Sequence, residues 1–145
     1  MNILVCEDDV LTLKTLEYAL KKDGYSIITA ADGLRGAEIL KENKDELDFM
    51  ITDQHMPYVS GLELVYMARV ELKMDIPIVM ITRVGLEEAK IRAGDLGVDE
   101  YITKPFNPGD LSDVVGRLRE KHISGKSSGT GDEGESYTGT DNRFS

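Results

Sequence analysis

Short apolar runs alternate along this chain with segments in which apolar residues recur three or four positions apart. The short runs predict five buried strands, over residues 3–6, 25–30, 47–53, 77–82 and 98–103. The periodic segments predict five helices, over residues 10–22, 34–43, 62–72 and 85–93 and from Asn107 past Leu118. Five strand-then-helix units predict an α/β domain with a five-stranded parallel sheet and helices on both faces. Because crossovers are right-handed, we expect the flavodoxin-like (βα)5 fold with strand order 2-1-3-4-5.

The apolar periodicity stops near residue 121, and the composition changes there. Residues 122–145 are rich in Ser, Gly and Thr, carry more acidic than basic side chains, and show no periodic apolar face. Such a composition predicts a flexible acidic tail or linker. The start of a connection to another domain is the alternative interpretation. We therefore expect a domain over residues 1–121 and a tail over residues 122–145.

Composition and charge narrow the classes of function. The chain has 145 residues, of which 41% are hydrophobic, so one domain with a substantial core is expected. A formal net charge of −10 disfavours direct binding to nucleic acid and suits metal cations or basic partners. The single cysteine, Cys6, excludes an intrachain disulfide and fits a small core residue. No secretory signal pattern or apolar stretch of roughly 18 residues occurs, so we expect a soluble cytoplasmic protein without membrane contact.

The carboxyl ends of the predicted strands carry the residues that could perform chemistry. Glu7 and Asp8 follow the first strand, Asp53 ends the third, Thr82 ends the fourth, and Lys104 follows the fifth. Taken alone, Asp53 fits a loop aspartate that caps a turn at least as well as a functional carboxylate. In a sheet of order 2-1-3-4-5, however, these four strands are neighbours, so their end residues should line one edge.

This set of side chains is suited to phosphoryl transfer. Crowded carboxylates repel one another unless a cation is present, and Mg²⁺ commonly binds carboxylates, waters and phosphate oxygens. An aspartate carboxylate can attack phosphorus and form an acyl phosphate. Lys104 and Thr82 would then share the charge on the phosphoryl oxygens. The sequence therefore predicts phosphoryl transfer onto Asp53 with Mg²⁺ as the cofactor.

Four segments together resemble one protein family. They are residues 3–9 (Ile-Leu-Val-Cys-Glu-Asp-Asp), 49–57 (Phe-Met-Ile-Thr-Asp-Gln-His-Met-Pro) with Gly61, 77–82 (Pro-Ile-Val-Met-Ile-Thr) and 97–106 (Gly-Val-Asp-Glu-Tyr-Ile-Thr-Lys-Pro-Phe). The sequence is similar to response-regulator receiver domains of two-component signalling, of the chemotaxis-regulator type. Each short segment is weak alone, whereas four at consistent spacing are specific. The resemblance covers about residues 1–121 and none of the tail.

The resemblance implies an acceptor residue and a set of metal ligands. Asp53 would be the phosphoacceptor. Mg²⁺ would be bound by Asp8 and Asp53, by Glu7 mainly through water, and by the backbone carbonyl of His55. The phosphoryl donor would be a sensor histidine kinase or a phosphotransfer protein. Such a domain promotes its own phosphorylation and dephosphorylation and is not otherwise an enzyme.

The resemblance also implies a conformational switch. Thr82 and Lys104 would contact the phosphoryl group, and the bond before Pro105 would be cis. Tyr101 would turn inward when Thr82 moves, which changes a face that binds an unknown downstream effector. A phosphorylation-dependent dimer is compatible with this scheme.

Two residues depart from the usual family pattern. Arg83 stands beside the phosphorylation pocket, where the family usually has a small residue. A long cation there would either obstruct the pocket or add phosphate affinity. Val84 is apolar and cannot orient an attacking water, so we expect a fairly long-lived phosphoryl state.

Three other classes of protein are alternatives to this interpretation. A receiver-like interaction module that is never phosphorylated would not need all five end residues intact. An aspartate-dependent phosphatase would need a cap or specificity insertion, for which the length leaves little room. A flavodoxin that binds a cofactor would need a first loop rich in Gly, Ser or Thr donors, and the acidic residues after the first strand are the opposite.

Overall fold

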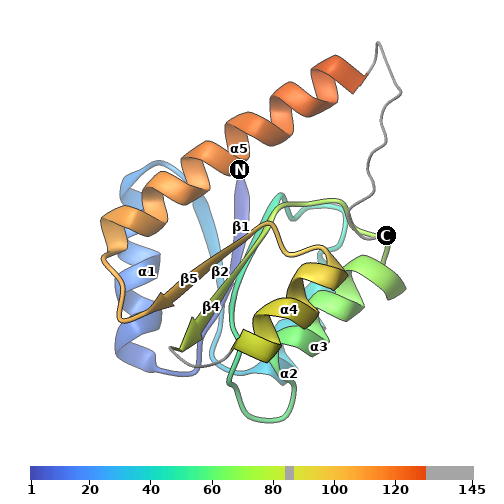
Figure 1. Cartoon of the computed structure of the whole chain (residues 1–145). Coiled ribbons are helices and arrows are strands. Elements are labelled where there is room, and N and C mark those ends of the chain that lie inside the picture. The colour runs from blue at the N-terminus through green and yellow to red at the C-terminus, as the bar shows by residue number, and fades with distance from the viewer. Residues whose placement is uncertain (84–86, 130–145) are drawn as a thin grey trace.

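Five parallel strands form one sheet with the order β2-β1-β3-β4-β5 (Figure 1). The computed structural model describes residues 1–83 and 87–129. Its strands are β1 (Asn2–Cys6), β2 (Ser26–Ala30), β3 (Phe49–Asp53), β4 (Ile78–Arg83) and β5 (Glu100–Lys104). Every neighbouring pair of strands is parallel. These observations confirm the flavodoxin-like fold predicted from the sequence.

Helices cover both faces of the sheet, as predicted (Figure 1). They are α1 (Val10–Lys22), α2 (Gly33–Glu42), α3 (Gly61–Tyr66), its continuation η1 (Met67–Glu71), α4 (Glu87–Leu96) and α5 (Pro108–Gly129). Helices α1 and α5 bury Leu16 and Val115 against one face, and α2 and α3 bury Leu40 and Leu64 against the other. Burial on both faces explains why the strands are almost continuously apolar. None of the helices in the described ranges combines the length and the apolar character that crossing a bilayer requires.

Polar side chains cap the N-termini of several helices at the carboxyl edge of the sheet. Asp9 accepts a hydrogen bond from Thr12 N at 3.0 Å, which confirms its prediction as the N-cap of α1. Ser60 caps α3 and forms a capping box with Glu63. Asn107 accepts from Gly109 N at 2.7 Å at the start of α5, as its position predicted. These caps fix where the loops end and the helices begin.

The predicted helix over residues 62–72 is not regular throughout. Its second half, η1, is π-helical, with Leu72 N donating to Met67 O at 2.8 Å. Lys73 follows with a positive φ of 53°. The wider turn points Arg69 at the backbone carbonyls of Gly97 (2.9 Å) and Ile76 (2.7 Å). Apolar periodicity could not predict this turn, because the turn serves a polar contact with a distant loop.

The ends of the last two helices, α4 and α5, also differ from the predictions. Helix α4 ends at Leu96 because Gly97, with φ of 96°, takes the left-handed conformation that terminates helices. The expected start of this helix at residue 85 lies outside the described residues. Helix α5 continues past residue 121 to Gly129, beyond its last buried apolar position, Leu118. Residues 122–129 are therefore helical, and residues 130–145 lie outside the described ranges, so the domain boundary stays a prediction.

Candidate functional site

Strand alternation places four charged side chains on the face of the sheet that α1 and α5 cover. Val5, Ile51, Ile81 and Ile102 belong to the core on this face. Side chains two residues apart on a strand share a face. The residues two positions further along these four chain segments are Glu7, Asp53, Arg83 and Lys104. The fold therefore gathers them at the carboxyl edge of the sheet, as the strand-end positions of Glu7, Asp53 and Lys104 predicted.

Lys104 joins two buried carboxylates. Its Nζ lies 3.0 Å from Glu7 Oε1 and 3.1 Å from Asp53 Oδ2. Glu7 is fully buried and only 1% of Asp53 is exposed. Burial lowers the pKa of Lys104, but its hydrogen bonds to Glu7 and Asp53 outweigh this effect and raise that pKa overall. The ammonium is therefore a permanent positive charge between the two carboxylates.

A third carboxylate completes what we call the acidic cluster, Glu7, Asp8 and Asp53. One oxygen from each lies within 4.8 Å of the others, and Asp8 is exposed. Burial raises the pKa of Glu7 to about 7, and the negative charge of Asp53 also raises it, against hydrogen bonds from Asp9 N and Lys104. Glu7 Oε1 is buried and has no hydrogen-bond partner among the described residues, although Lys104 lies close to it. Clustered oxygen ligands with excess negative charge are what Mg²⁺ prefers, so these residues fit the expected cofactor.

The loop after β3 is packed directly against the backbone of Asp53. His55 N donates to Asp53 Oδ1 over 3.4 Å, and the side chain of His55 is exposed. The side chain of Gln54 accepts from Leu62 N at 2.9 Å. A Cβ added at Gly61 would lie 2.4 Å from Asp53 O. Sequence reasoning missed the roles of Gln54 and Gly61, and the glycine that follows the proline turn was the signal for the second.

Strand alternation turns Thr82 and Tyr101 toward the side of the sheet that α3 and α4 cover, although Thr82 stands at the same carboxyl edge as Asp53. Thr82 is fully buried, and its hydroxyl has no hydrogen-bond partner in the described part of the chain. Tyr101, which is level with Met80 on β4, packs against the core beneath α3 and α4. Its hydroxyl donates to the carbonyl oxygen of Lys90 on α4 at 2.6 Å. Burial raises the pKa of Tyr101, and the charge of Asp95 adds to this effect.

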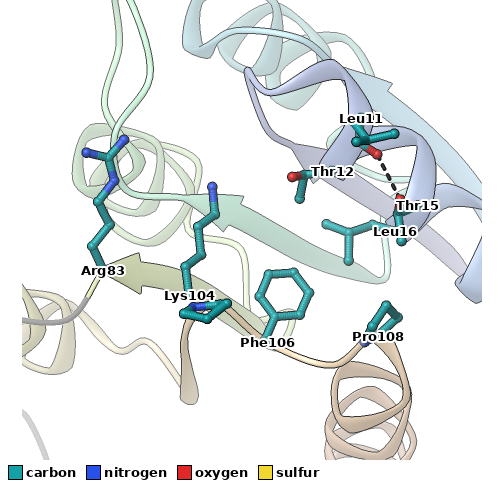
Figure 2. A pocket seen from close by; sticks show the side chains of 9 residues that line it. Leu11, Thr12, Thr15, Leu16, Arg83, Lys104, Phe106 and Pro108 are labelled. Atoms are coloured by element: carbon teal, nitrogen blue, oxygen red, sulfur yellow. Dashed lines mark hydrogen bonds between the residues drawn. The ribbon is translucent and has the colours of Figure 1, made fainter.

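A cavity of about 650 Å³ opens beside Lys104 (Figure 2). Arg83 and Lys104 line one side of it, and Thr12 and Leu16 of α1 line another. The peptide bond between Lys104 and Pro105 is cis, as the resemblance implied. Arg83 is exposed at the end of β4, whereas Val84 lies outside the described residues.

Comparison with protein families decides which kind of protein carries this site. Residues 3–116 match the family model for the response regulator receiver domain. The chain belongs to this family. The match begins at β1 and ends within α5, so it covers the whole sheet and all the residues of the site. Receiver domains are the phosphorylation-dependent switches of two-component response regulators.

Individual relatives support the same assignment. The two-component response regulator ORR24 of Oryza sativa subsp. indica is 31% identical over 144 residues, which are 98% of this chain and 23% of that protein. The alkaline phosphatase synthesis transcriptional regulatory protein PhoP of Bacillus subtilis (strain 168) is 36% identical over 129 residues, 88% of this chain and 52% of that protein. The crystal structure of a response regulator receiver domain protein from Clostridium thermocellum superposes with a TM-score of 0.76 at 29% identity, covering 84% of this chain and 98% of that one.

This chain spans only part of the length of these relatives. It corresponds to about half of the Bacillus protein and about a quarter of the rice protein. The relatives therefore do not identify the downstream partner of this chain.

Proposed function

We propose that this receiver domain is a phosphorylation-controlled switch in which Asp53 accepts a phosphoryl group from a phosphohistidine. The donor is a sensor histidine kinase or a phosphotransfer protein. The observation that carries this proposal is the contact of Lys104 with both Glu7 and Asp53 beside a cluster that fits Mg²⁺. A buried carboxylate that is already held by a permanent cation is in the environment that an attacking aspartate requires.

The transfer exchanges one bond to phosphorus for another. A carboxylate oxygen of Asp53 forms a bond to phosphorus while the bond from phosphorus to the donor imidazole breaks, and its electron pair stays on the imidazole nitrogen. Lys104 holds a phosphoryl oxygen, and the hydroxyl of Thr82, which has no partner among the described residues, donates to another. Hydrolysis of the acyl phosphate by water later restores Asp53.

The acidic cluster supplies the metal site in this proposal. Asp8 and Asp53 would hold Mg²⁺ directly, Glu7 would hold it mainly through water, and the backbone carbonyl of His55 would complete the protein ligands. The bound ion supplies positive charge that offsets the negative charge of the phosphoryl oxygens. The buried Glu7 Oε1 without a hydrogen bond supports this role, because a cation or its water shell would satisfy it.

The switch is the exchange of one set of contacts for another on the α3–α4 face. When Thr82 turns toward the phosphoryl group, Tyr101 gives up its bond to Lys90 O and moves inward. Phosphorylation thus biases an equilibrium between two arrangements of β5 and α4. The changed face binds a downstream effector or a second copy of the domain.

Incubation with Mg²⁺ and a small phosphodonor, followed by intact mass and gel filtration, tests the proposal. We expect the mass of one phosphoryl group on the wild type, its absence when Mg²⁺ is chelated, and its absence in Asp53→Asn. Asp45→Asn, which changes an exposed aspartate away from the site, is the matched control and should be phosphorylated normally. Equal labelling of wild type and Asp53→Asn would contradict the proposal. Continuous turnover of a phosphate ester that stops in Asp53→Asn would favour the phosphatase interpretation instead.

A further inference from the structure

We infer that the guanidinium of Arg83 binds the anionic phosphoryl donor at the mouth of the acceptor site. This inference rests on the proposed phosphorylation of Asp53 and adds to it a role for a residue outside the usual family pattern. The guanidinium holds the donor while the transfer takes place at Asp53 and undergoes no bond change itself.

The register of the sheet places Arg83 between the two residues that act on the phosphoryl group. Its strand, β4, lies between β3, which carries Asp53, and β5, which carries Lys104. Arg83 is level with Lys104, and Ile81 is level with Asp53. Neighbouring strands are about 4.8 Å apart, and two residues advance a strand by about 6.6 Å. Arg83 therefore starts one step further toward solvent than Asp53, on the same face, within the reach of one arginine side chain.

Arg83 and Lys104 line the same cavity. Figure 2 shows their side chains extending in the same direction from neighbouring strands, with the ring of Phe106 beside Lys104 and Thr12 across the cavity. The cavity has a volume of about 650 Å³ and meets the acceptor site at Lys104, which contacts Asp53, while Asp53 itself does not line it. A small phosphate compound or the side chain of a donor protein can enter such a space.

The two cations differ in what they already hold. Lys104 is engaged by Glu7 and Asp53. Arg83 is exposed, and among the described residues nothing forms a hydrogen bond or an ion pair with its guanidinium. A dianionic donor that approaches Asp53 is repelled by the acidic cluster, and Arg83 offers the positive charge that is not yet committed. The planar guanidinium presents two parallel N–H donors, which match two phosphate oxygens.

Obstruction of the site is the competing role for a long side chain at this position. With Arg83 in place, Lys104 Nζ still contacts Asp53 Oδ2 at 3.1 Å, so Arg83 does not displace this contact. Arg83 is exposed and forms no ion pair with Glu7 or Asp53. The two roles predict opposite effects of removing the guanidinium, so one experiment separates them.

The test measures the rate of Asp53 phosphorylation by acetyl phosphate in the presence of Mg²⁺, over a range of donor concentrations, by intact mass. In this reaction the bond from phosphorus to the acetate oxygen breaks with its electron pair left on acetate, and the new bond forms to Asp53. For Arg83→Ala we expect the rate at low donor concentration to fall about three- to tenfold, while the limiting rate stays within about twofold. Arg83→Lys should recover part of the loss, and added salt should reduce the difference from wild type.

Arg119→Ala is the matched control, because Arg119 is an exposed arginine on α5 that lines a different cavity near Met1 and Pro77. It should leave both rates unchanged. Equal or faster phosphorylation of Arg83→Ala at low donor concentration would overturn the inference, and a faster rate would show obstruction. If the wild type is phosphorylated at Asp53 and Arg83→Ala behaves identically, only this inference fails. If the wild type takes up no phosphoryl group, the proposed function fails with it.

Discussion

The two faces of the sheet hold their functional residues in different ways. On the α1–α5 face, Lys104 pairs with two buried carboxylates, Glu7 and Asp53. On the α3–α4 face, a single hydrogen bond to a helix carbonyl holds the half-buried Tyr101, and the hydroxyl of Thr82 has no partner among the described residues. Losing Lys104 from the first region leaves two buried carboxylates without their cation, whereas the second region can exchange one contact for another. The ion pairs of Lys104 therefore keep a fixed geometry, whereas the hydrogen bond of Tyr101 can change.

Glycine packing shows the same contrast. A Cβ at Gly61, beside the acceptor site, would meet backbone atoms of Asp53 and Gln54. A Cβ at Gly94, on α4, would meet the hydroxyl of Tyr101 at 3.0 Å and no other atom of the described residues within 4 Å. Backbone in a buried strand cannot move aside, but a tyrosine side chain can rotate. The same substitution should therefore have very different effects in the two regions.

Gly61→Ala should show the largest effect. The added methyl group would lie 2.4 Å from Asp53 O, so the loop or the strand must shift. We expect the free energy of unfolding, measured by urea denaturation, to fall by about 3 kcal/mol and phosphorylation to be largely lost. Gly116→Ala on α5 is the control, since nothing lies within 4 Å of its added Cβ, and it should be neutral or slightly stabilising. Equal urea midpoints for Gly61→Ala and wild type would mean that the acceptor loop is adjustable.

Lys104→Met should have the second largest effect on the free energy of unfolding. It leaves Glu7 and Asp53 buried without their cation, which we expect to cost about 2 kcal/mol of unfolding free energy without Mg²⁺. Added Mg²⁺ should restore part of this loss, because it brings positive charge to the same carboxylates. Lys21→Met removes an exposed ion pair with Glu17 and should change stability by no more than about 0.5 kcal/mol. The same small change in both variants would refute the idea that Lys104 holds the site together.

Arg69→Met tests how the other region is supported. Its guanidinium donates to the carbonyls of Met74, Ile76 and Gly97 and to Asp99. Removing these donors should cost about 1–2 kcal/mol and increase hydrogen exchange at η1 and at the start of β5. Because these hydrogen bonds of Arg69 do not involve the acidic cluster, the phosphorylation rate should stay within about twofold of wild type.

The control for Arg69→Met is Arg117→Met, which removes a largely exposed pair with Glu100 at 3.5 Å. It should leave stability and hydrogen exchange nearly unchanged. A large loss of phosphorylation in Arg69→Met would show that the two faces are more tightly coupled than their contacts indicate.

Gly94→Ala should have the smallest effect on stability, within about 1 kcal/mol. The gain in helix propensity and the loss of the Tyr101 hydrogen bond are of similar size and opposite sign. Its effect should be visible in the pKa of Tyr101, which burial and then Asp95 hold above the ordinary value. Because the neutral phenol is favoured in the folded state, this stabilisation is present below about pH 10 and is lost as the pH rises further.

Displacing the ring in Gly94→Ala should lower the pKa of Tyr101 toward the ordinary value. Ultraviolet titration of the phenolate follows this change, and Tyr101→Phe identifies which of the tyrosines is responsible. An unchanged titration in Gly94→Ala would indicate that Tyr101 is as firmly held as the acidic cluster.

The sequence predicted the first region better than the second for a physical reason. Strand ends and two-residue alternation follow from backbone geometry, so Glu7, Asp53 and Lys104 could be placed at one edge before the structure was known. The bond from Tyr101 to Lys90 O depends on a side-chain rotamer, which no spacing encodes. The π-helical turn at η1 depends on Arg69 meeting a loop far along the chain. The orientation of Arg83 likewise required the register of β4 against its neighbours.

The most direct measurement of the central claim is the identity of the residue that carries the phosphoryl group. Wild-type protein is phosphorylated with Mg²⁺ and a small phosphodonor, reduced with borohydride, digested and analysed by peptide mass spectrometry. An acyl phosphate on Asp53 is reduced to the alcohol, so the account predicts homoserine at position 53 and unmodified carboxylates at Glu7 and Asp8. Reduction at another carboxylate, or a phosphate ester on a serine or threonine with Asp53 unchanged, would contradict it.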